Sequence, residues 1–141
     1  MTRKPDWQSL LHAFLLEHQS EPFRYGRWDC CLFVCSAIYT MTGVDPASSF
    51  RGAYSSLRTA RLAIAAYGSG SVAELVETIT AKHGIQAIPV VCAQRGDIAL
   101  VPNRSDISLG LIGLNGREII LASARGLWKV PTSVAIRTWH V

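Results

Sequence analysis

The stretch YGRWDCCLFVCSAIYTMTG, residues 25–43, decides the expected fold because it carries signals for both ends of a helix. Asp29 is a residue type that caps helix N-termini, and Gly43 is typical of the left-handed residue that ends a helix. The stretch therefore predicts a helix from Asp29 to about Met41, with Cys30 in its first turn and on its buried face. The apolar stripe, spaced i, i+3, i+4, i+7, i+8 and i+11, consists of Cys30, Phe33, Val34, Ala37, Ile38 and Met41.

Helices are also predicted on both sides of this stretch. Asp6 can cap an N-terminal helix. Farther on, Ser71-x-x-Glu74 is a capping-box signature, and Gly84 ends the helix that it opens. A weaker helical pattern, ended at Gly68, lies between. The residues at helical spacing are Trp7, Leu10, Leu11, Phe14 and Leu15 in the first helix and Tyr54, Leu57, Ile64 and Ala65 in the weaker one.

From residue 85 onward the pattern changes to short β-branched or aliphatic runs broken by Gly, Pro and Asn. Asn115-Gly116 predicts a hairpin with a type I′ turn. Helices first and strands afterwards favour an α+β fold with an antiparallel β-sheet, in one domain that covers residues 1–141. The predicted strands lie in IQAIPVVCAQ (85–94), GDIALVP (96–102), ISLGLIGLNG (107–116), REIILAS (117–123), GLWKVP (126–131) and SVAIRTWHV (133–141).

Composition restricts the function classes. A chain of 141 residues, 49% apolar and 17% charged, suits one compact domain that needs no disulfides. We expect no signal peptide, because Asp6, Gln8, His12 and Glu17 interrupt the apolar residues near the N-terminus and no small-residue cleavage site follows. We also expect a soluble protein with no membrane span, because no run approaches the roughly 18 apolar residues of a membrane helix. The net charge is +4, with eleven Arg and three Lys, but these residues are scattered. The scatter argues against a nucleic-acid partner, whereas the arginine excess suits a protein interface.

The four cysteines, Cys30, Cys31, Cys35 and Cys92, are expected to be free thiols. Their spacing fits neither the common zinc patterns nor the usual iron–sulfur patterns, so we predict no metal and no cofactor, although the count alone leaves a metal or cluster open. Cys31, Cys35 and Cys92 are interpreted as buried reduced cysteines. Cys30 differs, because the first turn of a helix favours the thiolate.

Two segments carry a resemblance to a known family. YGRWDCCLFV places an Asp-Cys pair at a helix start, and RGDIALVP places a Gly-Asp pair at the start of a later strand. This order resembles the papain-like cysteine peptidases of the NlpC type, which cut peptide stems of bacterial cell walls. The resemblance implies a papain-like fold and puts the nucleophile position at Cys30.

The same resemblance also shows where the site departs from the family. In the family a histidine opens the strand after the Gly-Asp strand and acts as general base, and the aligned residue here is Ser108. A serine hydroxyl is not basic near neutral pH, so Ser108 marks the position of a missing base. Ser123 is the sole polar candidate for the third, orienting residue. The four histidines lie elsewhere in the sequence and are interpreted as solvated residues, with His140 near the C-terminus as the alternative base; they are His12, His18, His83 and His140.

A narrower resemblance concerns the combination FRYGRWDCCLFV, MTGVD, FRGAY, RGDIALV and a late GLW. It is similar to small phage and prophage proteins encoded among tail-morphogenesis genes. The resemblance implies a structural component of the tail tip or baseplate, assembled in the host cytoplasm and then carried in the virion tail. Its partners would be hub, fibre or distal tail proteins.

Three hypotheses follow in order. The first is a virion structural protein with an NlpC-like fold and a degenerate cysteine site. The second is an active cysteine peptidase or amidase that acts on peptidoglycan through Cys30, with a base from an unrecognised group or a partner chain. The third is a metal or iron–sulfur subunit that uses Cys30, Cys31, Cys35 and Cys92.

Overall fold

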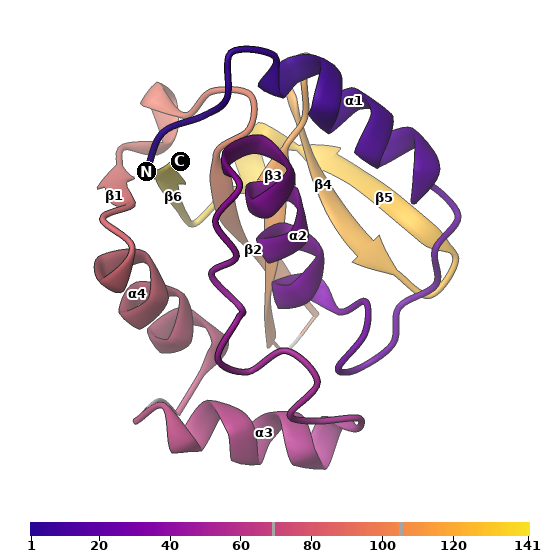
Figure 1. The fold of residues 1–141 in the computed structure, drawn as a ribbon, viewed down its shortest axis with the longest axis vertical. Helices are drawn as coiled ribbons and strands as arrows, with labels where there is room; N and C mark the ends of the chain where they lie inside the picture. Colours follow the sequence, from indigo (N-terminus) through magenta and orange to yellow (C-terminus); the bar gives the residue numbers. More distant parts are fainter. Residues whose placement is uncertain (69, 105) are drawn as a thin grey trace.

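The computed structural model describes residues 1–68, 70–104 and 106–141. In these residues four helices precede six strands, as the sequence predicts (Figure 1). Two short 3-10 helices, η1 (Val90–Cys92) and η2 (Thr132–Val134), interrupt the strand region. The helices are α1 (Trp7–Glu17), α2 (Cys30–Thr42), α3 (Leu57–Ala66) and α4 (Val72–Lys82).

The described strands form one antiparallel sheet in the order β1-β6-β2-β3-β4-β5. The C-terminal strand β6 thus lies between β1 and β2 and is not at an edge. This arrangement confirms the predicted α+β class and the antiparallel sheet. The strands are β1 (Gln86–Ile88), β2 (Ile98–Asn103), β3 (Asp106–Ile112), β4 (Glu118–Ser123), β5 (Gly126–Pro131) and β6 (Arg137–His140).

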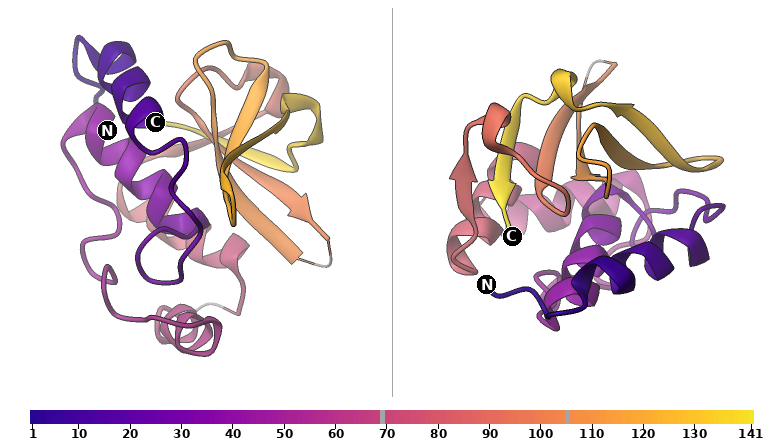
Figure 2. Two further views of the ribbon diagram at one scale, coloured as in Figure 1. Left: turned by 90° about the vertical axis from the view of Figure 1, so that its right-hand side faces the viewer. Right: turned by 90° about the horizontal axis from the view of Figure 1, so that it is seen from above.

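The helices gather on one side of the sheet, and α2 lies closest to it (Figure 2). Burial of each large apolar side chain in this layer contributes about 1.5–3 kcal/mol. The opposite side of the sheet has a smaller core of its own, formed by Ala99, Val101, Ile112 and Ile119. The main core between α2 and the sheet includes Phe33, Val34, Ile38, Ile98, Leu100, Leu109 and Leu111.

Both predicted ends of α2 are confirmed. The side chain of Asp29 accepts a hydrogen bond from the Leu32 N–H at 3.0 Å, and Gly43 ends the helix with φ 82°. The expected burial of Cys30 is wrong, however: Cys30 is half-buried, whereas Cys31 and Cys35 are buried. The reason is that α2 is enclosed on nearly every side, so one apolar stripe does not describe its buried surface. Cys30, at the end of the helix, remains partly open.

Other local expectations are corrected in the same way. Cys92 is exposed, because it lies in η1 outside the sheet rather than in a buried strand. Tyr54 precedes α3, whose N-terminus is capped by Ser56 and Thr59. Asp6 occupies the cap position of α1, but its side chain makes no capping hydrogen bond.

The hairpin between β3 and β4 exists, but its turn is not of type I′. Only Gly116 has a positive φ, of 70°, whereas a type I′ turn needs a positive φ at Asn115 as well. The Asn115 side chain instead accepts a hydrogen bond from the Arg117 N–H and donates one to Glu118. These two bonds stabilise a wider loop between the strands.

Candidate functional site

The start of α2 is fixed by the buried carboxylate of Asp29, which is 4% exposed. It accepts hydrogen bonds from the Gly26 N–H at 3.0 Å, the Leu32 N–H at 3.0 Å and the Tyr54 hydroxyl at 2.6 Å. Gly26 has φ 77°, and an ideal Cβ there would lie 1.7 Å from the Tyr54 carbonyl oxygen. Only glycine fits this contact, so the loop before Cys30 is locked against the segment that carries Tyr54.

The Cys30 thiol lies in an environment of hydrogen-bond donors. Its Sγ is 4.0 Å from the Cys31 Sγ, and the Leu109 N–H and the Ser108 hydroxyl also face it. The contact with the Cys31 thiol lowers the pKa of Cys30 most, burial opposes this effect, and the Leu109 and Ser108 donors lower the pKa further. Asp29 acts in the opposite direction but does not reverse the result. Cys30 therefore forms its thiolate at a lower pH than an ordinary cysteine does.

The Leu109 N–H can face the Cys30 thiol because backbone amides alternate in direction along β3. The Ile112 N–H donates to the Asp97 carbonyl on the β2 side, so amides at odd positions of β3 point toward β4. The register of β3 with β4 pairs Leu111 with Ile120 and Ile112 with Ile119, at the far end of β3 from Ser108. In the N-terminal half of β3, the Leu109 N–H on the β4 side therefore points toward the Cys30 thiol.

The structure places Ser108 beside Cys30, as the alignment of the two motifs led us to expect. Ser108 is 7% exposed and lies in β3. Ser123 has a different role from the one considered for it: its hydroxyl donates to the Gly126 carbonyl at 2.5 Å, and its carbonyl accepts from the Phe23 N–H. Ser123 thus fixes the β4–β5 hairpin and the loop before α2.

The neighbouring cysteines are less suited to chemistry. Burial and the Cys30 contact raise the pKa of Cys31 well above its ordinary value, with the contact as the larger cause. Burial raises the pKa of Cys35 to about 12. Cys31 lines two apolar cavities of about 30 and 20 Å³, each of about the size that holds one water. These cavities are too small for a peptide substrate.

None of the groups that act most strongly on Cys30 is an imidazole. His12 lines a groove between α1 and the β4–β5 hairpin. His18 packs against Trp28, with ring centroids 4.6 Å apart, and His83 is the C-cap of α4. These three side chains have roles in packing or at the surface.

His140 belongs to a second polar cluster, at the opposite end of α2. Its Nδ1 lies 2.9 Å from the Asp97 carboxylate, and Gly96, next to Asp97, packs against Met41 near the end of α2. The 13 residues of α2, at about 1.5 Å each, separate that end from Cys30 by about 18 Å. His140 is thus not within reach of Cys30, and the hypothesis that it substitutes for the base is wrong.

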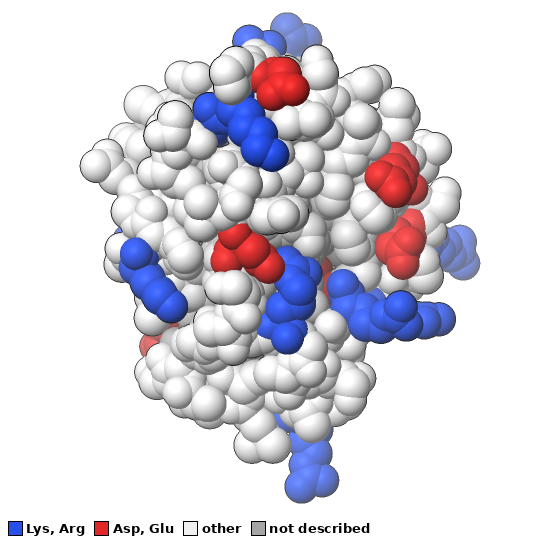
Figure 3. All heavy atoms as spheres, in the orientation of Figure 1, with Lys and Arg blue, Asp and Glu red and all other residues white. Residues whose placement is uncertain are grey.

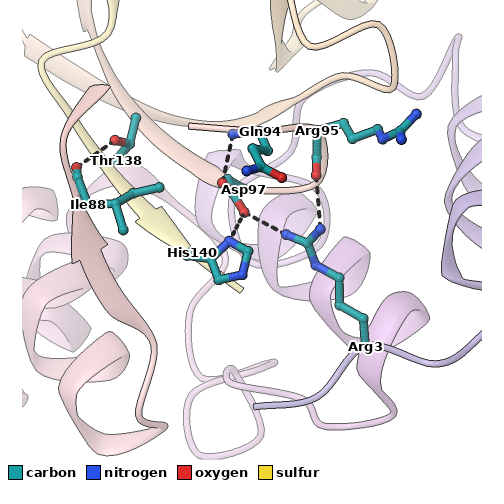
Figure 4. Close-up of polar contacts among 7 residues, drawn as sticks. All are labelled: Arg3, Ile88, Gln94, Arg95, Asp97, Thr138 and His140. Carbon is teal, nitrogen blue, oxygen red and sulfur yellow. Dashed lines mark hydrogen bonds and ion pairs between the residues drawn. The ribbon is translucent and has the colours of Figure 1, made fainter. Parts of the chain in front are cut away.

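The second cluster is centred on Asp97, whose side chain is fully buried (Figure 4). Besides His140, it binds Arg3 at 2.5 Å and the Gln94 N–H at 2.8 Å. Arg3 lies 94 residues away from Asp97 in the sequence. Burial lowers the pKa of Arg3, and the Asp97 charge partly opposes that shift. The two ends of the chain are thereby tied to one carboxylate.

Within residues 1–68, 70–104 and 106–141, no three His, Cys, Asp or Glu side chains are grouped so as to hold a metal ion. All four cysteines are free thiols. Among the described helices, none is long and apolar enough to cross a membrane. On the face shown in Figure 3, the Lys and Arg side chains are scattered among uncharged residues.

These features define an α+β protein with a helix-start cysteine whose hydrogen-bonding neighbours are Cys31, Leu109 and Ser108. A family model matches residues 2–141, and the chain belongs to this family, DUF6950, a domain family of unknown function. A search among curated proteins found no match.

Proposed function

We propose that the chain is a structural component of a bacteriophage or prophage tail tip or baseplate, with an NlpC-like fold whose catalytic base is missing. The observation that carries the proposal is the presence of Ser108 beside Cys30, where the peptidases that the sequence resembles use a histidine. The role in the tail rests on the narrower resemblance of the sequence. The expected partners are hub, fibre or distal tail proteins.

The chemistry of the Cys30 site supports a role without catalysis. A serine hydroxyl can donate a hydrogen bond to a thiolate, but it does not take up the thiol proton and return it to a leaving group near neutral pH. The adjacent Cys31 has a raised pKa and is not a proton acceptor at that pH. Without a base the Cys30 thiol does not complete the peptidase reaction, so binding or packing remains as the role of the site.

The order of the elements supports the NlpC-like part of the proposal. The Asp-Cys pair lies at the start of α2, and the Gly-Asp pair lies directly before β2. Asp29 and Asp97 both have structural partners that account for them without catalysis. The two motifs can thus persist in a protein that has lost the reaction.

An active cysteine peptidase or amidase is the second candidate, and one observation favours it. Cys30 is half-buried rather than enclosed, and its pKa is lowered. A partner chain that brings an imidazole to Ser108 would complete a thiol–imidazole pair. Its substrate would be a cell-wall peptide of peptidoglycan.

The test is genetic complementation in the prophage that encodes the chain. We expect deletion of the coding sequence to give incomplete tails in electron micrographs, and both the wild-type chain and Cys30→Ala to restore them. Mass spectrometry of purified particles should detect the chain in the tail. Normal tails after deletion would contradict the structural role.

The same experiment separates the two candidates. If Cys30→Ala fails to restore tails or infection, and purified particles release cell-wall peptides only with the wild-type chain, the peptidase candidate replaces the structural one. A Ser36→Ala chain is the matched control, since Ser36 lies on the same helix away from its first turn.

A further inference from the structure

The thiols of Cys30 and Cys31 lie side by side at the start of α2. Their Sγ atoms are 4.0 Å apart, and Cys30 is half-buried, so the pair can be reached from solvent through Cys30. Metal–thiolate bonds are about 2.3 Å long, so two such bonds can join sulfurs that lie up to about 4.6 Å apart. The observed separation is therefore within the range that a single metal ion bridges.

The ligands that this pair offers restrict the kind of ion. Within the described residues, no third His, Cys, Asp or Glu side chain joins the two thiols in a group that could hold a metal. The Asp29 carboxylate, next in the chain, already accepts three hydrogen bonds. Structural zinc needs a tetrahedral set of ligands, and calcium or magnesium needs oxygen ligands. Two thiols without further ligands suit a soft ion, and thiolates select Cu(I).

The surroundings of the two sulfurs also favour a soft ion. Cys31 lines two cavities of about 30 and 20 Å³, whose other lining residues are mostly apolar. A strongly hydrated cation would lose its water ligands against such walls without replacement, whereas Cu⁺ exchanges them for thiolates. The Leu109 N–H and the Ser108 hydroxyl face Cys30 and can donate hydrogen bonds to its sulfur when a metal is bound.

A monovalent ion can replace the proton between the two sulfurs without changing the buried charge. When Cys30 is a thiolate and Cys31 a thiol, the pair carries a single negative charge. On binding Cu⁺, each sulfur donates an electron pair to the ion and the Cys31 thiol releases its proton to solvent, so the site again carries a single negative charge. We infer that Cys30 and Cys31 bind one Cu⁺ ion as a pair of thiolate ligands. This inference goes beyond the proposed function and requires neither the role in the tail nor a catalytic base.

The test is an anaerobic titration of the reduced Cys92→Ala chain with Cu⁺, in competition with the coloured chelator bicinchoninate. The Cys92→Ala background removes an exposed thiol that would bind copper by itself. We expect the chain to take one copper per molecule from the chelator complex. No transfer of copper, or one copper shared between two chains, would overturn the inference.

Matched variants in the same background identify the ligands. Cys30→Ser and Cys31→Ser each remove one sulfur, and Cys35→Ser is the control, one helical turn beyond Cys31. Loss of a group that only supports a metal ligand costs about 10- to 100-fold in affinity, so loss of a ligand itself should cost about 100-fold or more. Cys35→Ser should keep the affinity of the background chain. A loss confined to Cys30→Ser, or equal losses in all three variants, would overturn the assignment.

X-ray absorption at the copper edge makes the result independent of the folding of the serine variants. The copper-loaded Cys92→Ala chain should show two sulfur neighbours around the metal and neither nitrogen nor oxygen. An excess of Zn²⁺ should not displace the copper, because two thiols do not supply a tetrahedral set of ligands. Any other set of neighbours, or displacement by Zn²⁺, would contradict a site made of these two thiolates.

Discussion

Asp29 and Asp97 are two buried carboxylates with different kinds of partner. Asp29 directly precedes α2, and Asp97 directly precedes β2. Asp29 accepts three hydrogen bonds from neutral donors, two of them within three residues in the chain. Asp97 binds Arg3 and His140, which lie near the two ends of the chain, as well as a local amide. The first carboxylate shapes a loop, and the second connects distant segments.

The difference shows how each motif contributes to the molecule. Around Asp29 the chain can form its bonds as the helix begins, because the donors are local except for Tyr54. Around Asp97 the bonds form only when β6 and the N-terminal segment have reached the sheet. We therefore expect the Asp97 cluster to matter most for overall stability and the Asp29 cluster to matter most for the geometry at Cys30.

The largest effect should follow from Asp97→Ala. The substitution leaves the mostly buried Arg3 guanidinium without its carboxylate, and breaking a buried pair in this way costs about 3–5 kcal/mol. Urea unfolding of the variant measures the loss in free energy of unfolding. Asp6→Ala is the control, since the exposed Asp6 makes no capping bond, and it should change little. If Asp97→Ala loses no more free energy of unfolding than the control, the Asp97 cluster does not stabilise the fold.

An intermediate effect is expected for Tyr54→Phe. The variant removes one donor from the buried Asp29 carboxylate, and a hydrogen bond to a charged group contributes about 1.5–3 kcal/mol. Tyr39→Phe is the matched control, because Tyr39 is 54% exposed. Both free energies of unfolding come from denaturant titration. If the two variants lose the same amount, Tyr54 does not support Asp29.

The smallest effect concerns Asp45, a third carboxylate that is closer to the surface. Burial raises the pKa of Asp45, but the Arg51 and Ala47 hydrogen bonds outweigh it and lower the pKa below its usual 3.8. A lowered folded-state pKa gives stability that is present above pH 3.8 and is lost as the pH falls through the folded-state value.

Asp45→Asn should therefore cost up to about 1 kcal/mol at neutral pH, because Arg51 is more than a third exposed. The cost should disappear in acid, where both chains carry a neutral group at this position. Denaturant titrations at several pH values measure it, with Asp106→Asn as an exposed control. A difference that stays constant down to acidic pH would rule out the ion pair as its source.

The sequence predicts those parts of the fold whose signals are local. Helix α2 was predicted with nearly correct ends because Asp29 and Gly43 act within one turn of the chain. The six strands were predicted from their β-branched and aliphatic runs, and the helix-then-strand order gave the antiparallel class. The type I′ turn was wrong because the side-chain bonds of Asn115 compete with the backbone preference.

The sequence predicts the candidate site only where the family motifs indicate which residues, far apart in the chain, lie close together. The family alignment brought Ser108 next to Cys30, although 78 positions separate them in the sequence. No sequence signal connected Tyr54 with Asp29, or Arg3 and His140 with Asp97, because these contacts arise from packing between distant segments. Periodicity failed for Cys30, since burial at a helix end depends on the neighbouring elements.

The rate of iodoacetamide alkylation of Cys30 as a function of pH, read by peptide mass spectrometry on the native protein, tests the central claim most directly. A donor-stabilised thiol without an imidazole should show one inflection, at a pH below the ordinary thiol value of about 8.5, and Ser108→Ala should move that inflection upward. Rapid alkylation that persists to about pH 5, with a second inflection, would reveal a thiolate–imidazolium pair and contradict the missing base.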